Sequence, residues 1–467
     1  MVSGVTFLLF YNMLLFILVI NMQDILKNCS FVFEELEKSG FECFAVGGCV
    51  RDILLNTEPN DIDFTTNAKP DEILECFKDY ETFELGKKYG TISVLKDDKI
   101  YEITTFRVDG KYSDSRHPDG VQFSRSLYDD LSRRDFTINA MAMDKNGNIT
   151  DIFSGKKDLK NKIIRTVGKP DERFSEDALR IFRALRFSCK LGFEIEKSTA
   201  KAIKNLSHLL VNVHPQRIRD ELTALLLTDK APDIISEYRE VFFCIIPELK
   251  KTEDFRQITA HHRYDVFIHT LNAIKFAPYD AEIRFALLFH DIAKPDCHTT
   301  DKAGISHFNG HPSKSADIAA EILKRFAFHS EFVNKVSLFI RYHDKRFEKP
   351  RLHIKKLLSV LNEDDFRKLL TIQRCDVYAQ SDYLKTEKLA HIEYIESQLS
   401  KIIAEKPCIK LSELAVDGND LLSLGFNGKE IGNTLNKLLE LVIEEKINND
   451  KDALLKKCKE LISGIDK

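Results

Sequence analysis

Two aspartates separated by one residue are the first candidates for chemistry. They lie in Asn60-Asp61-Ile62-Asp63-Phe64, where apolar residues alternate with carboxylates as in a β-strand. Residues i and i+2 of a strand share a face, so Asp61 and Asp63 would present two carboxylates side by side. Like charges so close are costly without a cation between them, and metal-assisted phosphoryl transfer uses that arrangement. A solvated strand face is the alternative for Asp-x-Asp alone.

A glycine pair upstream strengthens the phosphoryl-transfer interpretation. Gly47-Gly48-Cys49-Val50-Arg51-Asp52 lies between a predicted strand at Phe44–Val46 and a predicted helix at Val50–Leu55. Glycines there let a phosphate approach backbone N–H groups at a helix N-terminus, although a plain tight turn has the same signature. Glu102, on a predicted neighbouring strand, is a candidate third carboxylate, and an exposed strand glutamate is its alternative.

Arginine-rich segments follow the predicted strands. The first is Arg133-Arg134-Asp135-Phe136-Thr137-Ile138-Asn139-Ala140, and the second is a predicted helix over 176–187. At about 3.6 residues per turn, Asp177, Arg180 and Arg183 would form a slanting row on one flank, with Arg186 turned further round. Aspartate and arginine together offer acceptors and donors that can imitate a base-pairing partner. A salt-bridged helix face is the alternative.

A second set of candidate residues consists of histidines and aspartates on successive predicted helices. Neutral imidazoles with carboxylates suit a hard-to-borderline metal ion. A lone histidine on such a helix is usually a core residue, but several of them with an adjacent His-Asp pair favour a metal site. The candidate ligands are His269, His290, Asp291, His311, His343 and Asp376.

The secondary structure predicted around these residues indicates the fold: an α+β head, with a mixed sheet and helices, followed by an elongated all-α body. The chain has 467 residues, enough for roughly three domains. Hydrophobic residues make up 43%, which excludes a disordered or low-complexity chain. We expect a leader at 1–21, a head at 22–150, a base-recognition neck at 151–220, a helical body at 221–385 and a helical tail at 386–467.

Charge and cysteine content narrow the classes of protein. The net charge of −4 means that any nucleic-acid contact must come from a local basic surface. The ten cysteines include no C-x-x-C pair, which argues against a zinc ribbon or a disulfide scaffold and fits a reducing cytoplasm. There is no tryptophan, so base stacking would have to use other side chains.

The first residues are strongly apolar. The run from Phe7 to Ile20 is short of the roughly 20 residues that a membrane-spanning helix needs, and no Lys or Arg precedes Asp24. A membrane anchor and a buried helix are alternatives, but we favour a start of translation at Met22 and expect no membrane association.

In their order along the chain, the four head motifs resemble those of the bacterial class II tRNA nucleotidyltransferases, the CCA-adding enzymes, whose head belongs to the polymerase-β superfamily. The motifs are Gly-Gly-x-Val-Arg-Asp, Asp-x-Asp, Arg-Arg-Asp-Phe-Thr-Ile-Asn-Ala and Glu-Asp-x-x-Arg. The resemblance is strong over about 40–220. It continues weakly through Gly418-Asn419-Asp420-Leu421 and then Gly425, Gly428 and Gly432.

The resemblance implies template-independent addition of CCA to tRNA, using CTP, ATP and Mg²⁺. Asp61 and Asp63 would hold Mg²⁺, while Gly47, Gly48, Arg51 and Arg134 would contact the triphosphate. Asp177 and Arg180 would pair with the base, supported by Arg183 and Arg186. In this family the switch from C to A is attributed to a flexible loop, and residues 109–118 occupy its place. An A-adding relative, a poly(A) polymerase, and a metallohydrolase with an RNA-binding head are the alternatives.

The histidine set resembles the HD phosphohydrolase superfamily. His269, His290, Asp291 and Asp376 match its basic pattern, and His311 and His343 would complete a second metal position. The resemblance implies phosphatase or 2′,3′-cyclic phosphodiesterase activity with a divalent transition metal such as Mn, Ni, Co or Fe. A degenerate, purely structural domain is the alternative. The sequence makes no prediction of oligomeric state.

Overall fold

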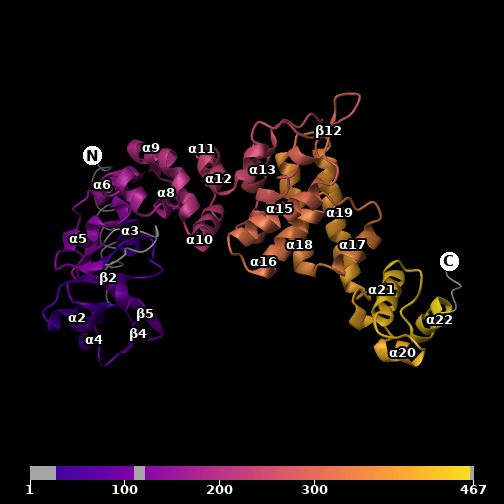
Figure 1. Cartoon of the computed structure of the whole chain (residues 1–467), viewed down its shortest axis with the longest axis horizontal. Coiled ribbons are helices and arrows are strands. Elements are labelled where there is room, and N and C mark those ends of the chain that lie inside the picture. The colour runs from indigo at the N-terminus through magenta and orange to yellow at the C-terminus, as the bar shows by residue number, and fades with distance from the viewer. Residues whose placement is uncertain (1–27, 110–120, 463–467) are drawn as a thin grey trace, which may run out of the picture. The chain divides into compact units, whose positions relative to one another are not determined.

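The computed structural model describes residues 28–109 and 121–462, which fall into two compact units divided between Ile246 and Pro247 (Figure 1). The division lies inside the segment 221–385 that the sequence predicts as one domain, because α11 (Ala231–Glu237) and α12 (Arg239–Ile245) pack on helices of the first unit. The predictions for residues 1–21 and for the loop at 110–118 lie outside the described residues.

A mixed seven-stranded sheet forms the head of the first unit, as predicted. β2 is parallel to β5, while β1 is antiparallel to both β2 and β8. The strand order is β3 (Glu81–Phe83), β4 (Thr91–Lys96), β5 (Lys99–Thr105), β2 (Asp63–Thr66), β1 (Cys43–Val46), β8 (Ala142–Met143) and β9 (Ile149–Thr150). Short pairs lie outside this sheet: β6 (Arg107–Asp109) with β7 (Val121–Phe123), and β10 (Ile163–Ile164) with β11 (Glu194–Ile195).

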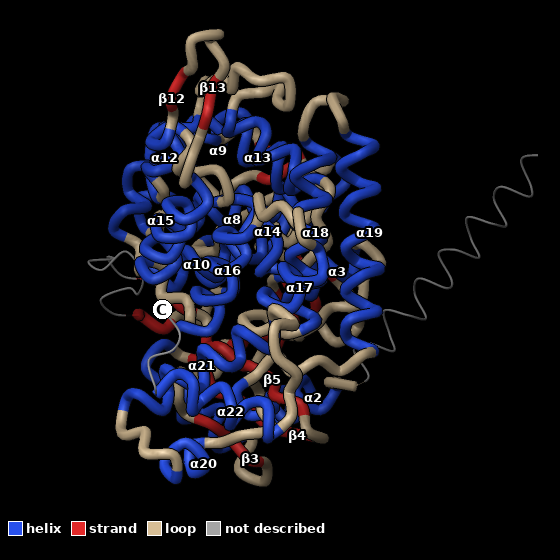
Figure 2. Tube along the Cα trace, turned by 90° about the vertical axis from the view of Figure 1, so that its right-hand side faces the viewer, coloured by secondary structure: helices blue, strands red, loops and turns tan. Residues whose placement is uncertain are grey.

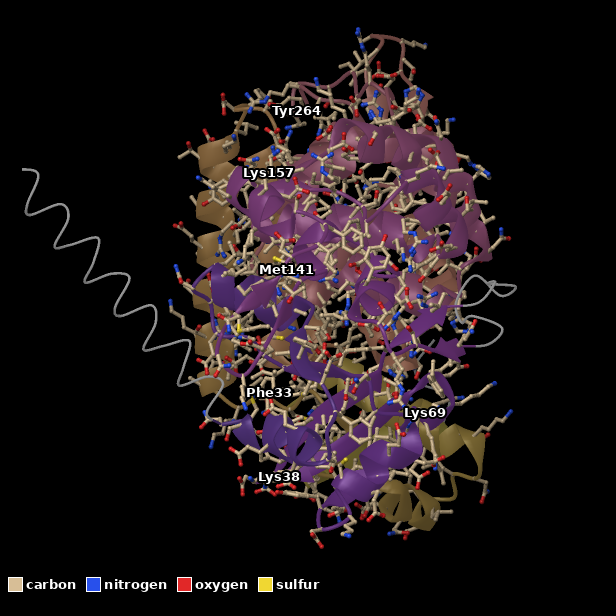
Figure 3. The ribbon with its side chains drawn as sticks, turned by 90° about the vertical axis from the view of Figure 1, so that its left-hand side faces the viewer. Phe33, Lys38, Lys69, Met141, Lys157 and Tyr264 are labelled. Atoms are coloured by element: carbon tan, nitrogen blue, oxygen red, sulfur yellow. The ribbon has the colours of Figure 1, made fainter. Side chains whose placement is uncertain are left out.

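Burial of Phe64 sets the orientation of β2. Its ring is fully buried and meets Phe33 of α2 (Ser30–Lys38) edge-on, with the ring centroids 5.3 Å apart; Figure 3 labels Phe33. Since strand residues alternate between faces, Asp63 lies on the opposite face from Phe64. β4 and β5 form a hairpin, and its turn residues Asp97 and Asp98 have φ values of 51° and 58°.

Helices cover the sheet and build the neck. The predicted helix over 176–187 is wrong at its start, because the chain forms two helices with Asp177 in extended conformation between them. The remaining helices of the first unit are α3 (Gly48–Leu54), α4 (Pro70–Cys76), α5 (Leu127–Ser132), α6 (Gly155–Asn161), α7 (Pro170–Glu176), α8 (Leu179–Leu191), α9 (Lys197–Leu206) and α10 (Pro215–Leu226).

The second unit is helical apart from the hairpin of β12 (Thr299–Thr300) and β13 (Ser306–His307), as Figure 2 shows in blue and red. α13 packs on α18, and α14 packs on α16. The helices are α13 (Val266–Lys275), α14 (Ala281–Phe289), α15 (His311–Arg325), α16 (Ser330–Tyr342), α17 (Pro350–Leu358), α18 (Glu363–Ala379), α19 (Lys385–Ala404), α20 (Gly418–Ser423), α21 (Lys429–Ile443) and α22 (Lys451–Ile462).

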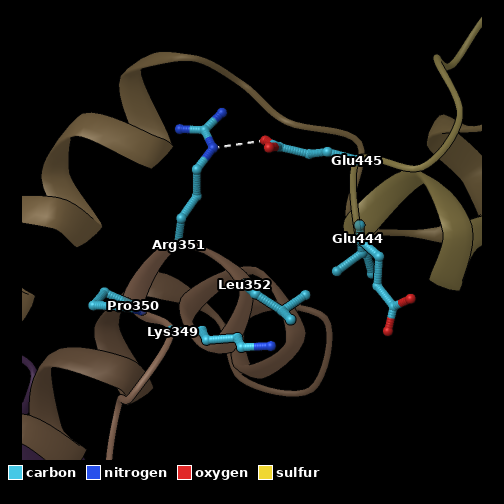
Figure 4. A pocket seen from close by; sticks show the side chains of 7 residues that line it. Lys349, Pro350, Arg351, Leu352, Glu444 and Glu445 are labelled. Carbon is cyan, nitrogen blue, oxygen red and sulfur yellow. Dashed lines mark hydrogen bonds and ion pairs between the residues drawn. The ribbon is translucent and has the colours of Figure 1, made fainter.

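Ion pairs join α17 to the end of α21 around a small pocket (Figure 4). Arg351 Nε lies 2.6 Å from Glu445 Oε1, and Lys356 Nζ lies 2.6 Å from Glu444 Oε1. These contacts tie the last helices to the body and offer no catalytic arrangement. Within 28–109 and 121–462, no helix has both the length and the hydropathy needed to cross a bilayer. No disulfide joins the ten cysteines, all of which lie in the described residues.

Candidate functional site

The carboxylates of the head meet where two parallel strands run side by side. Asp63 is the first residue of β2 and stands in register with Glu102 of β5. Asp61 lies two residues before the strand. Asp63 is accessible to solvent yet surrounded by protein, and this crowding, followed by the charge of Glu102, raises its pKa. A raised carboxyl pKa among like charges indicates a place where a cation would relieve repulsion.

The glycine turn brings an arginine toward these carboxylates. Gly47 has a φ of 82°, and a Cβ atom there would lie 3.1 Å from Nη1 of Arg134. Arg134 also opposes the raised pKa of Asp63, which places its charge near that carboxylate. Its Nη2 donates to Asp130 at 3.0 Å, while its buried Nε has no hydrogen-bond partner. The turn, Arg134 and Asp63 therefore form one polar surface suited to a metal-bound triphosphate.

Arg51 has a different environment from the one that a triphosphate contact would suggest. It is 4% exposed, its Nε donates to Asp52 and its Nη1 donates to Asn139 Oδ1, both at 2.8 Å. Its guanidinium also lies over the ring of Phe187, 5.1 Å from the centroid. In this structure Arg51 joins α3 to the 133–140 motif, and its contact with a triphosphate stays a prediction.

The break between α7 and α8 directs the carboxylate of Asp177. Its Oδ1 accepts a hydrogen bond from the Leu179 amide at 3.0 Å. Arg217 of α10 donates two hydrogen bonds to the same carboxylate, a bidentate fork with Nη2–Oδ2 at 2.7 Å and Nη1–Oδ1 at 3.3 Å. Both contacts depend on the break, because Asp177 would be oriented differently if α7 and α8 formed one continuous helix.

The three arginines of α8 are held by acidic and carbonyl groups. Arg180 donates to Glu176 at 2.7 Å and to the carbonyl of Arg133 at 3.0 Å. Arg183 donates to Asp135 at 2.8 Å. Glu221 of α10 forms ion pairs with both Arg183, at 3.4 Å, and Arg186, at 2.5 Å. The row predicted from helical spacing is therefore a preorganised polar network.

Sequence reasoning missed several members of this network: Asp130, Arg217 and Glu221. Arg217 and Glu221 are one helical turn apart on α10, so they face the same neighbour. An Arg and a Glu at i and i+4 are common on exposed helices, and only the packing of α10 on α8 distinguishes this pair.

Asp130, the third missed residue, is fully buried beside two arginines. Burial would raise the pKa of Asp130, but Arg133 and Arg134 hold it below its usual value.

All six predicted histidine-set residues come together in the second unit. His269 belongs to α13 and Asp376 to α18, His290 and Asp291 follow α14, and His343 follows α16. His311 is the first residue of α15. Helix ends thus converge on one point, and His269, His290, Asp291, His311 and His343 are all at least nine-tenths buried.

Asp291 divides this cluster into two groups of potential metal ligands. One group is His269, His290 and Asp291, and the other is Asp291, His311 and His343; within each, the ligand atoms lie within 4.8 Å of one another. Oδ2 of Asp291 is 3.2 Å from His290 Nε2, whereas Oδ1 is 3.3 Å from His311 Nε2. Asp376 Oδ1 adds a contact of 2.8 Å to His269 Nε2. Among the described residues, Asp61, Asp63 and Glu102 do not form a third such group.

Backbone carbonyls orient three of the imidazoles. The Nδ1 atoms of His290, His311 and His343 lie 2.7, 2.8 and 2.6 Å from the carbonyl oxygens of residues three positions earlier. A protonated Nδ1 that donates to a carbonyl leaves the lone pair on Nε2, which is the atom facing the cluster. Metal-binding histidines are oriented in this way by their outer-shell partners.

The electrostatics of the cluster call for a cation. Both oxygens of Asp291 and Nε2 of His290 are buried without a well-formed hydrogen bond. Burial would raise the pKa of Asp291, but His290 and Lys294 hold it well below its usual range. Burial would lower the pKa of His290, yet Asp291 and Asp376 raise it to about 10, so the carboxylates favour a positive charge at Nε2, which a metal ion would supply in place of the proton. Buried carboxylates surrounded by imidazole nitrogen atoms fit a divalent transition metal.

Family models match three parts of the chain. The model described as "Poly A polymerase head domain" matches residues 43–165. That described as "Probable RNA and SrmB- binding site of polymerase A" matches 192–250, and "tRNA nucleotidyltransferase domain 2 putative" matches 313–458. The first match contains the glycine turn, the strand carboxylates and the 133–140 motif.

Relatives and solved structures extend the comparison to nearly the whole chain. The CCA-adding enzyme of Lactobacillus helveticus is 33% identical over 445 residues, which cover 94% of this chain and 98% of the relative. That of Leuconostoc citreum is 34% identical, covering 93% and 96%. The Bacillus stearothermophilus CCA-adding enzyme in complex with CTP matches with a TM-score of 0.67 and 26% identity, covering 93% and 96%. The chain therefore belongs to the family of CCA-adding enzymes, as its ordered head motifs predict.

Proposed function

We propose that this chain adds or repairs the 3′-terminal CCA of tRNA, using CTP and ATP. The near-complete coverage of a CCA-adding relative at 33% identity carries this proposal. Attack of the tRNA 3′-OH on the nucleotide α-phosphate would occur beside Asp63 and Glu102. We place the reaction in the cytoplasm, in keeping with ten cysteines that form no disulfide.

The residues of the head would have three roles: binding the metal, the triphosphate and the base. Asp61 and Asp63, with Glu102 beside them, would hold Mg²⁺, which when bound lowers the pKa of the attacking hydroxyl and stabilises the leaving pyrophosphate. Gly47, Gly48 and Arg134 would receive the triphosphate. Asp177 would accept a hydrogen bond from the base amino group that both cytosine and adenine carry, with Arg180 as the donor beside it.

Labelled CTP and ATP, offered singly and together to a tRNA transcript ending at its discriminator base, test this proposal. We expect addition of C, C and A, and its loss in Asp61→Ala. Asp71→Ala, which removes an exposed aspartate of α4, is the matched control. Incorporation of A alone onto a CC-ended transcript would point instead to an A-adding enzyme, and ATP polymerisation without regard to tRNA to a poly(A) polymerase.

A second activity is supported by the bridged histidine cluster. We infer that His269, His290, Asp291 and Asp376, with His311 and His343, hold divalent transition metal such as Mn, Ni, Co or Fe for hydrolysis of a phosphoester. When bound, the metal would supply an activated water and polarise the phosphoryl group. The observation that favours this inference is the division of Asp291 between two sets of buried imidazoles.

Metal content and hydrolysis test the second activity together. We expect the purified protein to carry transition metal by elemental analysis and to hydrolyse 2′,3′-cyclic AMP or a phosphomonoester. Asp291→Asn should lose both while retaining CCA addition, and Asp61→Ala should do the reverse. His307→Ala, an exposed histidine outside the cluster, is the control. A protein with no bound metal and unchanged hydrolysis in Asp291→Asn would contradict the inference.

A further inference from the structure

Three nitrogen-bearing side chains lie beside the cluster of candidate metal ligands: Gln257 and His262 from a short segment before α13, and Lys294 from the turn after α14. Lys294 Nζ lies 2.7 Å from Asp291 Oδ2, and it donates to Gln257 Oε1 at 2.8 Å. His262 packs edge-on against His269, with ring centroids 5.0 Å apart. None of the three belongs to the predicted ligand set, and the proposed phosphohydrolase leaves their purpose open.

Two of these side chains present buried nitrogen atoms that have no partner. Nε2 of Gln257 and Nδ1 of His262 are inaccessible to solvent and make no hydrogen bond. Gln257 is 5% exposed. Its amide orientation is decided by Lys294, because a reversed amide would direct its NH₂ group at the ammonium. A buried donor without an acceptor is destabilising, so each of these atoms calls for a partner that the protein itself does not supply.

The segment is held in place by surrounding structure. Ile258 accepts a backbone hydrogen bond from Ser306 at 3.0 Å, and His261 accepts one from Ser381 at 2.8 Å. Arg256 and Asp265 form an isolated antiparallel bridge at its base. Tyr264, labelled in Figure 3, belongs to the same segment. The backbone that carries Gln257 and His262 is therefore fixed beside the cluster by contacts on both sides of the segment.

The charge of the site selects an anion. Two carboxylates, Asp291 and Asp376, balance only part of the charge of two divalent cations, and Lys294 adds another positive charge. A phosphoryl group would neutralise the excess and supply oxygen acceptors for the unpartnered nitrogens. We propose that Gln257, His262 and Lys294 form an anion subsite beside the cluster that binds the phosphoryl oxygens of its substrate. This proposal rests on the phosphohydrolase activity proposed above.

Binding of inorganic phosphate to the full-length protein tests the subsite directly. Isothermal titration calorimetry with and without added Mn²⁺ would measure its affinity, and Asp291→Asn would report any binding elsewhere on the chain. We expect His262→Leu and Gln257→Leu each to weaken phosphate binding about tenfold or more. His262→Asn, whose amide nitrogen occupies nearly the place of Nδ1, should restore most of the affinity.

Metal content separates the possible roles of His262. We expect His262→Leu to keep the wild-type metal content and melting temperature, because the residue would bind the anion and not the metal. Unchanged phosphate affinity in both leucine variants would overturn the subsite. Loss of metal in His262→Leu would also overturn it, by making His262 a ligand. A wild-type protein that binds no metal would refute the proposed phosphohydrolase activity but not the anion subsite. In that case the phosphate affinity measured without Mn²⁺ would still test Gln257 and His262 as hydrogen-bond donors.

Discussion

Replacing Arg217 by methionine removes the two hydrogen bonds that hold the carboxylate of Asp177, which we propose pairs with the base. The shorter bond, Nη2 to Asp177 Oδ2 at 2.7 Å, is charge-assisted, and the two side chains are only 21% and 12% exposed. Such a bond contributes about 1.5–3 kcal/mol, and the 3.3 Å bond adds little. With Asp177 released, we expect kcat/KM for both CTP and ATP to fall roughly 10- to 100-fold, since each 1.4 kcal/mol is about tenfold.

Steady-state kinetics with a tRNA ending at the discriminator base would measure this loss, together with misincorporation of UTP and GTP. Arg217→Lys keeps the charge but not the fork, and should recover only part of kcat/KM. Arg219→Met, which removes an arginine paired with its neighbour Asp220 on the same helix, is the matched control. If Arg217→Met lowered the melting temperature but left kcat/KM and base selection unchanged, the residue would be structural and the positioning argument would be wrong.

Three further predictions concern stability and metal binding. The pKa of Asp130 is lowered in the folded protein, so its ion pairs stabilise the fold above about pH 3.8. This stabilisation is lost as the pH falls below 3.8 and through the lower pKa of the folded state. The free energy of urea unfolding of Asp130→Asn should therefore differ from that of the wild type most at neutral pH and least below pH 3.8. Mn²⁺ at about 100 times its Kd should stabilise the second unit by roughly 2.7 kcal/mol in thermal melts, and Asp291→Asn should abolish the shift. Gly155→Ala places a Cβ atom against the backbone oxygen of Thr137 and should cost about 1–3 kcal/mol in thermal melts. Gly432→Ala, whose Cβ would have nothing within 4 Å, should be neutral or slightly stabilising.

Local sequence patterns were sufficient to predict the α+β head and the residue types of its candidate site. Alternation around Phe64 predicted that Asp63 lies on the face opposite the apolar residues, and Glu102 was expected on a neighbouring strand, where β5 indeed pairs it with Asp63. These features depend on residues close in sequence, whose periodicity reports which face is buried. The histidine set was equally visible, because histidines and aspartates recur on successive predicted helices, with His290 and Asp291 adjacent at the end of one of them.

Only the tertiary structure decided which charged groups meet. The helical period hid the break at Asp177, where the backbone is extended and the carboxylate accepts a hydrogen bond from the Leu179 amide. The partnership of Arg217 with Asp177 and the engagement of Arg51 with Asn139 join segments 40 or more residues apart, and no periodicity records such pairs. Likewise, the unpartnered nitrogen of Gln257 beside the metal ligands exists only once α13 and α14 pack, since burial and hydrogen-bond satisfaction belong to the folded chain.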